Sequence, residues 1–209
     1  GCTSLGTLDL VTVEKIEANA FESLGISELT IPTSVSSIGA NAFKSCGSLT
    51  KIIYPNTNIA FDKTMLADCG ILTSVKITGT GSITHYATGN QPWTSVIGQI
   101  TKIEFDTTVT TIPNYAFEKA IGLKSSASSS IVWGGVTTIG DYAFSECTGF
   151  TGTFTIPNQI NTLCQYAFNK CTKITGLSIG TGLSAISNYA FNGCSSLQPF
   201  TIPSTINTI

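Results

Sequence analysis

One short motif recurs along the whole chain, and this repetition constrains the fold more than any other feature of the sequence. The motif pairs alanine with phenylalanine and places cysteine or an apolar residue three positions later. It reads IEANAFESL (16–24), IGANAFKSC (38–46), IPNYAFEKA (112–120), IGDYAFSEC (139–147), LCQYAFNKC (163–171) and ISNYAFNGC (186–194). With two degenerate copies included, the aromatic position runs Phe21, Phe43, Leu66, Trp93, Phe117, Phe144, Phe168 and Phe191. Units of 22 to 27 residues cannot each bury their own apolar face, so we expect them to stack as a solenoid.

A second pattern, L-x-x-I-x-I-P-x-x-V-x-x-I, follows each aromatic position. In one copy, Leu49, Ile52 and Tyr54 lead to Pro55. The period of two predicts a short strand, and proline ends that strand because it has no N–H to donate. Strands of neighbouring coils would lie about 4.8 Å apart and form a parallel sheet on one face. The A-F-x-x-C segment favours a tight helical or 3₁₀ turn on the other face, where the phenylalanines would form a buried stack.

The combined motif, I-G-x-x-A-F-x-x-C-x-x-L-x-x-I-x-I-P, resembles the BspA-like class of leucine-rich repeats. The resemblance covers nearly the whole chain, apart from irregular stretches near 79–92 and 124–131. It implies a leucine-rich-repeat solenoid, and a bacterial or protozoan surface protein linked to adhesion and host contact. We therefore expect one repeat domain over residues 1–209, with about eight to nine coils. Both ends fall within a repeat, which favours a fragment of a longer protein.

Cysteine occurs seven times, and its phase in the repeat favours packing over chemistry. The cysteines three residues after the aromatic position, or after its substitute, are Cys46, Cys69, Cys147, Cys171 and Cys194. Other coils hold Leu24, Val96 and Ala120 there, so we interpret the position as a packing site for a small apolar group. Stacked side chains would point the same way, so we expect reduced thiols. Cys164 lies off the ladder; Cys2 is either a repeat position or an N-terminal cysteine that carries lipid.

The composition argues against several classes of function. Hydrophobic residues make up 42% of the chain and charged residues 11%, which indicates a large buried core. The net charge is -2 and none of the ten basic residues is arginine, so we expect no nucleic-acid partner. No apolar run is long enough for a transmembrane segment. With one histidine and no glycine-rich phosphate loop, G-x-S-x-G or C-x-x-C motif, we expect no catalytic site, metal or cofactor.

Two kinds of position remain as candidates for ligand binding. The variable residues of the strand motif point out of the sheet, and the charged ones that we select are Lys51, Lys76, Lys102 and Glu104. Insertions into a regular scaffold often carry contacts, and the insertion at 79–93 holds His85 and Tyr86. A second insertion, 124–135, places Trp133 where other repeats have proline. We expect Tyr86 and Trp133 to be exposed aromatic anchors, whereas a solvent-facing loop histidine without a ligand is the alternative for His85.

The leading hypothesis is a non-catalytic recognition or adhesion module, extracellular or on the cell surface. It would bind a host or neighbouring-cell protein or glycan through the sheet face and the inserted loops. One alternative is a structural spacer or stalk that carries other domains. Another is a parallel β-helix enzyme acting on polysaccharides, which would need clustered carboxylates with lysine or arginine; the chain has no dense acidic cluster.

Overall fold

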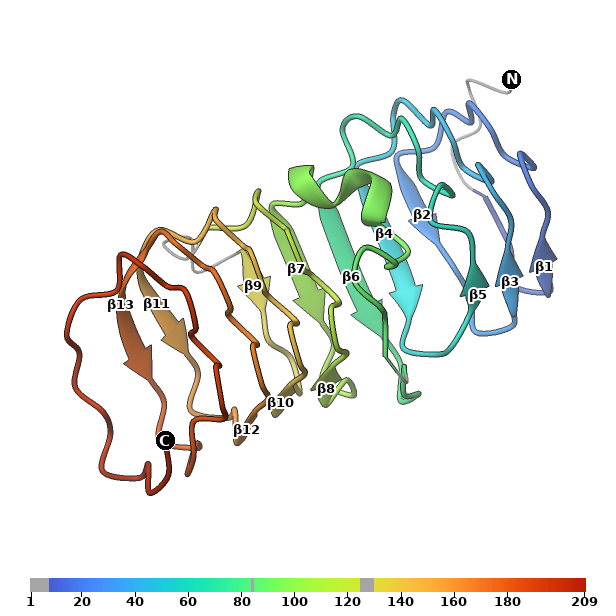
Figure 1. Ribbon diagram of the computed structural model, residues 1–209. Helices are drawn as coiled ribbons and strands as arrows, with labels where there is room; N and C mark the ends of the chain where they lie inside the picture. Colours follow the sequence, from blue (N-terminus) through green and yellow to red (C-terminus); the bar gives the residue numbers. More distant parts are fainter. Residues whose placement is uncertain (1–7, 84, 125–129) are drawn as a thin grey trace.

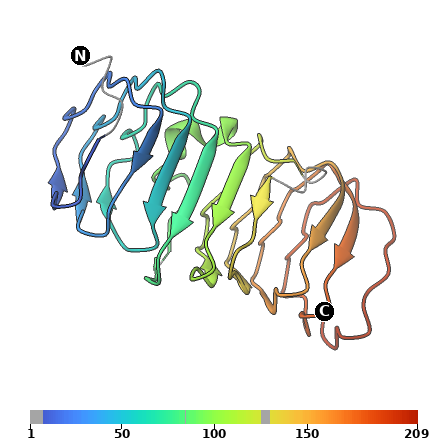
Figure 2. The ribbon, with the colours of Figure 1, turned by 180° about the vertical axis from the view of Figure 1, so that it is seen from behind.

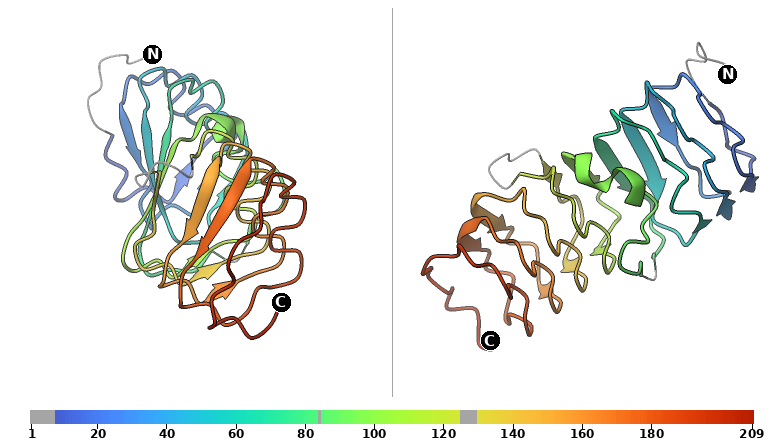
Figure 3. Two further views of the ribbon diagram at one scale, coloured as in Figure 1. Left: turned by 90° about the vertical axis from the view of Figure 1, so that its left-hand side faces the viewer. Right: turned by 45° about the horizontal axis from the view of Figure 1, so that its top comes forward.

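The computed structural model describes residues 8–83, 85–124 and 130–209 and shows an elongated, gently twisted solenoid (Figures 1 and 3). The described part of the chain begins and ends at opposite ends of the long axis (Figure 1). The coils wind around one continuous apolar core that extends from Leu10 to Cys194. The predicted leucine-rich-repeat solenoid is therefore confirmed. Cys2 lies outside the described residues, so its two interpretations stay open.

One face of the solenoid is a parallel sheet built from the I-x-I segments (Figure 2). Its five paired strands are β2 (Glu28–Thr30), β4 (Lys51–Pro55), β6 (Ser74–Thr78), β7 (Lys102–Phe105) and β9 (Ile131–Val132). Two further parallel strands, β11 (Gly152–Ile156) and β13 (Ile174–Ile179), continue this face toward the C-terminus. Along each strand the apolar side chains turn inward, as Ile52, Val75 and Ile103 do with no exposed surface. The period of two in the sequence therefore corresponds to the alternation of inward and outward side chains in a sheet with one buried face.

The V-x-x-I segments form shorter parallel strands on the opposite wall of the coil. They are β1 (Lys15–Ile16), β3 (Ser37–Ile38) and β5 (Ala60–Phe61), followed by β8 (Thr111–Ile112), β10 (Thr138–Ile139) and β12 (Thr162–Leu163). These strands make two separate three-stranded sheets, β1-β3-β5 and β8-β10-β12. Between β5 and β8, the described residues of the insertion at 79–93 form no strand that pairs with either of them. The five-stranded sheet is therefore continuous from β2 to β9, whereas the opposite wall is divided into two sheets between β5 and β8.

Stacked aromatic rings fill the inside of the solenoid. Phe43, Phe117, Phe144 and Phe168 have no exposed surface, and neither does Trp93 in a degenerate coil. Neighbouring rings lie nearly parallel, with centroids 5.9 Å apart for Phe117 and Phe144 and 5.4 Å apart for Phe144 and Phe168. Aromatic pairs at such separations add stabilisation beyond the area that they bury. Each coil thus covers the apolar surface of the next one.

The A-F-x-x-C segments form tight turns that also link the coils. Phe144 is flanked by two residues with left-handed backbones. They are Tyr142 and Glu146, with φ of 55° and 59°. Such residues stop a helical run, so the turn does not continue into a 3₁₀ helix. Among the described residues, the one 3₁₀ helix is η1 (Thr94–Gln99), which follows Trp93. Three turn N–H groups, of Tyr142, Phe144 and Glu146, donate to the carbonyls of Gln165, Ala167 and Asn169 in the next coil at 3.2, 2.8 and 2.7 Å.

Candidate functional site

The outer face of the long sheet brings four of the predicted binding residues together. Lys51 on β4, Ser74 on β6 and Lys102 on β7 are paired in register. The next outward row pairs Lys76 on β6 with Glu104 on β7. Because neighbouring strands lie about 4.8 Å apart, these side chains lie within two strand spacings of one another. We call Lys51, Lys76, Lys102 and Glu104 the sheet-face cluster.

Ion pairs hold part of the sheet-face cluster in place. The Lys51 Nζ lies 3.1 Å from Glu28 Oε2 on β2, and the Lys102 Nζ lies 2.5 Å from Glu104 Oε1. In the part of the chain that the structure describes, no ion pair joins Lys76 to an acidic side chain. The hydrogen bond from Lys102, with the positive charges of Lys102, Lys51 and Lys76, lowers the pKa of the Glu104 carboxyl. The cluster therefore keeps its carboxylate ionised and carries one lysine without a direct partner.

The C-terminal part of the same face has a different chemical character. On β11 and β13 the outward residues include Thr153, Thr155 and Ser178, all of which are exposed. Val132 on β9 stands between the two parts and is 44% exposed. The face therefore changes from charged side chains to short hydroxyl side chains along the solenoid.

The insertion at 79–93 packs tightly against the neighbouring coils, and one prediction about it is wrong. Tyr86 is buried, with its ring in edge contact with Phe61 and Trp93 at 6.1 and 5.8 Å. Burial, with a smaller contribution from Tyr54, raises the pKa of Tyr86 well above its usual value. Tyr86 therefore offers no exposed ring as an anchor. The sequence does carry a signal for this placement, because Ile83-x-x-Tyr86 has the spacing of the V-x-x-I strand motif.

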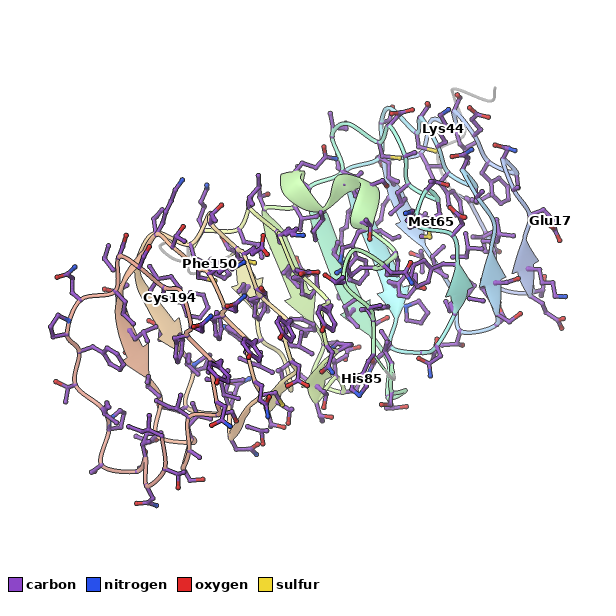
Figure 4. The ribbon with its side chains drawn as sticks, in the orientation of Figure 1. Glu17, Lys44, Met65, His85, Phe150 and Cys194 are labelled. Atoms are coloured by element: carbon purple, nitrogen blue, oxygen red, sulfur yellow. The ribbon has the colours of Figure 1, made fainter. Side chains whose placement is uncertain are left out.

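His85 is exposed, as the loop interpretation expects, and lies at an edge of the molecule (Figure 4). It is not part of the sheet face, since the backbone N–H of the adjacent Tyr86 donates to the carbonyl of Asn114, just beyond β8. Polar contacts also hold the C-terminal part of the insertion. The Glu118 carboxylate accepts from Thr88 and Gly89, and the Trp93 Nε1–H donates to the Ala116 carbonyl.

Trp133 also differs from its predicted place. Val132 pairs with Glu104, so Trp133 follows in line with Phe105, an inward position, and the proline position falls one residue later. The Trp133 ring is half-buried and meets the Phe144 ring edge-on at 6.2 Å. Trp133 therefore packs against the core and is only partly exposed, so its role as an exposed aromatic anchor stays a prediction.

The cysteine positions have a hydrogen-bonding role that the sequence did not reveal. The thiols of Cys69, Cys147, Cys171 and Cys194 each lie 3.2 Å from the carbonyl of the aromatic residue in the preceding full motif: Phe43, Phe117, Phe144 and Phe168. Cys46 makes the same contact with Phe21 at 3.4 Å. All six described cysteines are free thiols. Burial raises the pKa of the Cys147 thiol, so it stays protonated and is a poor nucleophile.

A row of stacked tyrosines on the turn side is a second feature that sequence reasoning missed. Tyr115, Tyr142, Tyr166 and Tyr189 stack with centroids 4.6 to 4.9 Å apart. Each stands two residues before a ladder phenylalanine, and the repeated Y-A-F was the available signal. Because their faces cover one another, the inner rings expose mainly edges and hydroxyl groups.

Two features are absent from the described residues. These residues contain no group of three or more histidine, cysteine, aspartate or glutamate side chains that would hold a metal ion. Nor do residues 8–83, 85–124 and 130–209 include an apolar helix of membrane-spanning length. The geometry offers a broad sheet face with fixed charges, a scaffold suited to binding.

These features define a leucine-rich-repeat scaffold. The chain belongs to the BspA-type leucine-rich repeat family, whose model matches six copies over residues 1–92 and 89–209. Comparison with curated proteins gave no match.

Solved structures of bacterial repeat proteins are similar to the chain. A leucine-rich cell surface protein from Faecalibacterium prausnitzii A2-165 has a TM-score of 0.52 and 20% identity, covering 92% of this chain and 52% of that one. A leucine-rich repeat protein from Bacteroides ovatus ATCC 8483 has a TM-score of 0.49 and 19% identity, covering 96% of this chain and 67% of that one. The chain thus spans about half the length of the first of these proteins. At this identity the likeness shows the fold alone.

Proposed function

We propose that the protein is a non-catalytic recognition module that works outside the cell or on its surface. It binds a protein or glycan through the outer face of β4, β6 and β7. The observation that carries this proposal is the sheet-face cluster, in which lysines and a glutamate from three neighbouring strands form one charged surface. The family, and a solved relative described as a cell surface protein, support the proposed location.

The ordered scaffold beneath this face supports a binding role. The residues directly under the cluster, Ile52, Val75 and Ile103, are fully buried, so the strands that carry the charges are held rigidly. Side chains placed in advance lose less conformational freedom on binding, which favours affinity. His85 lies apart from this surface, so we give it no part in the proposed site.

The test is a neutral steric block at the centre of the face. Ser74 stands in register between Lys51 and Lys102, and Ser74→Tyr places a bulky ring there without changing the charge. Thr138→Tyr, on the outer side of β10, is the matched control because it puts the same ring on the opposite wall. Tyrosine is favoured in strands, so both variants are expected to fold.

Both variants and the unmodified protein would be screened against immobilised host matrix proteins, mucin-type glycans and acidic polysaccharides. We expect a ligand whose binding is lost in Ser74→Tyr and kept in Thr138→Tyr. Equal binding by all three proteins, or no binding in any panel, would refute the proposed face.

A spacer role is the second candidate, and the shape of the molecule favours it. The described part of the chain begins and ends at opposite ends of a long, continuously packed solenoid, a geometry that holds flanking segments apart (Figure 1). In that case the surface reach of the protein would shorten in proportion to the coils deleted, and neither tyrosine variant would change any measured property.

A further inference from the structure

The chemistry of the sheet face points to a particular class of ligand, and this step rests on the proposed function. The outward residues at the centre of the face are Lys51, Ile53, Ser74, Lys76, Lys102 and Glu104. Interfaces with proteins are enriched in aromatic residues, methionine and arginine, and depleted in lysine, glutamate and serine. None of the enriched types points outward from the described strands of this face. Its composition suits a hydrophilic ligand better than a protein partner.

The charge distribution specifies the sign of that ligand. The whole chain has a net charge of -2, yet the central strands present three lysines against Glu28 and Glu104. Lys51 and Lys102 are paired, so Lys76 supplies the charge in excess. A local excess of positive charge on a chain of net negative charge favours the approach of an anion at the sheet face.

The spacing of the lysines suits a chain-like ligand. Lys51 and Lys102 are two strands apart, about 10 Å, and Lys76 lies on the strand between them. A polymer that crosses the strands along the solenoid axis would meet the three ammonium groups in turn. It would then reach the hydroxyl side chains of Thr153, Thr155 and Ser178, which suit hydrogen bonds to sugar hydroxyls.

We propose that the sheet face binds an acidic polysaccharide that lies across the strands, with its carboxylate or sulfate groups at Lys51, Lys76 and Lys102. Glu104 has a positioning role. Its carboxylate holds the Lys102 ammonium at 2.5 Å and opposes the approach of an anion. Removing the charge of Glu104 therefore strengthens binding, whereas removing the charge of a lysine weakens it.

The experiment measures dissociation constants for three defined probes at low and at physiological salt. A heparin-derived octasaccharide carries sulfate and carboxylate, a hyaluronan octasaccharide carries carboxylate alone, and a neutral dextran oligosaccharide carries neither. The variants are Lys76→Gln, the double variant Lys51→Gln/Lys102→Gln, and Glu104→Gln. Lys15→Gln is the matched control, because Lys15 is exposed on β1 of the opposite wall. Circular dichroism and melting curves check that each variant is folded.

We expect at least one acidic probe to bind and the dextran to fail. Lys76→Gln should weaken binding about three- to fivefold and the double variant about tenfold or more, in line with surface charge contacts. Glu104→Gln should tighten binding, and Lys15→Gln should leave it unchanged. Binding should also fall as salt rises. The comparison of the two acidic probes identifies the anionic group that is recognised.

Three outcomes would overturn the inference. The first is equal binding of the acidic and neutral probes, and the second is an equal loss of binding in Lys15→Gln and Lys76→Gln. The third is that neither acidic probe binds, while another ligand binds and its binding is blocked by Ser74→Tyr. In that case the sheet face is still the binding surface, but its ligand is not an acidic polysaccharide. If Ser74→Tyr blocks no ligand at all, the proposed function fails as well.

Discussion

From the contacts at the centre of the aromatic stack we can predict how much a truncated ring lowers the free energy of unfolding. Phe144 has no exposed surface and its ring meets Phe117, Phe168, Phe150 and Trp133 at centroid distances of 5.4 to 6.2 Å. Truncating a buried phenylalanine to alanine costs about 3–5 kcal/mol. The four ring contacts, which stabilise beyond the area that they bury, place Phe144 at the upper end of this range. We therefore expect Phe144→Ala to lower the free energy of unfolding by about 5 kcal/mol.

A phenylalanine near the end of the stack provides the control for the effect of truncating a ring at its centre. Phe191 is half-buried and stacks on Phe168 alone, so Phe191→Ala should cost about 2 kcal/mol. Phe144→Leu keeps most of the side-chain volume and should cost about 1–2 kcal/mol. Urea unfolding would be followed by far-UV circular dichroism and by tryptophan fluorescence, since Trp133 lies against Phe144.

The placement of Phe144 at the centre of the stack and of Phe191 at its end predicts the order of these three effects. It would be refuted by equal losses in Phe144→Ala and Phe191→Ala, or by a Phe144→Ala protein that unfolds at the same urea concentration as the unmodified chain. A change in the slope of the transition would indicate that the coils unfold in separate groups, as linear repeat arrays can do.

Three further predictions address other parts of the molecule. A thiol reagent applied to the native protein should modify half-exposed Cys164 before buried Cys147, as read by mass spectrometry; the reverse order would contradict the buried thiol row. Tyr86→Phe should raise stability by about 1 kcal/mol in urea unfolding, because the buried Tyr86 hydroxyl has no hydrogen-bond partner among the described residues; a clear loss would reveal a partner. The lowered pKa of Glu104 keeps its carboxylate charged down to a pH below the usual titration range of a glutamate side chain. Fluorescence titration with the heparin octasaccharide should therefore give tighter binding by Glu104→Gln at pH 7 and a difference that closes only below that pH; closure near pH 6 would argue against the assignment.

The repeat was predictable from the sequence because its period and its apolar positions are set by the stacking itself. The aromatic ladder, the I-x-I strands and the buried thiols all follow from one rule, that each coil must cover the next. The outward rows of β4, β6 and β7 also followed from the I-x-I motif, which aligns Lys51 with Ser74 and Lys102 although the two intervals differ in length. The outward positions of Lys51, Lys76, Lys102 and Glu104 on the sheet were therefore predictable from the sequence, whereas their role in binding stays a prediction.

Predictions were wrong where insertions changed the count. Trp133 was assigned to a proline position because residues 124–131 break the pattern, and only strand pairing shows that it follows Val132 in the inward row. Tyr86 was considered a loop residue because the insertion around it is rich in glycine and threonine, although its spacing from Ile83 matches a strand. The hydrogen bonds between turns were hidden for a different reason. They depend on residues with a left-handed backbone, such as Tyr142, and the residue type alone does not predict this backbone conformation.

The contacts between regular coils, those with both the phenylalanine and the cysteine, are nearly the same from one junction to the next. A ring lies on a ring, a thiol donates to a carbonyl, and turn amides such as that of Phe144 donate to the coil that follows. The upper and lower surfaces of a regular coil therefore complement each other, and a whole coil can be duplicated or excised with its junctions intact. Such a protein can change its length in evolution by unequal recombination, whereas the coil that carries the 79–93 insertion, fitted to Asn114 and Glu118, has only one place in the array.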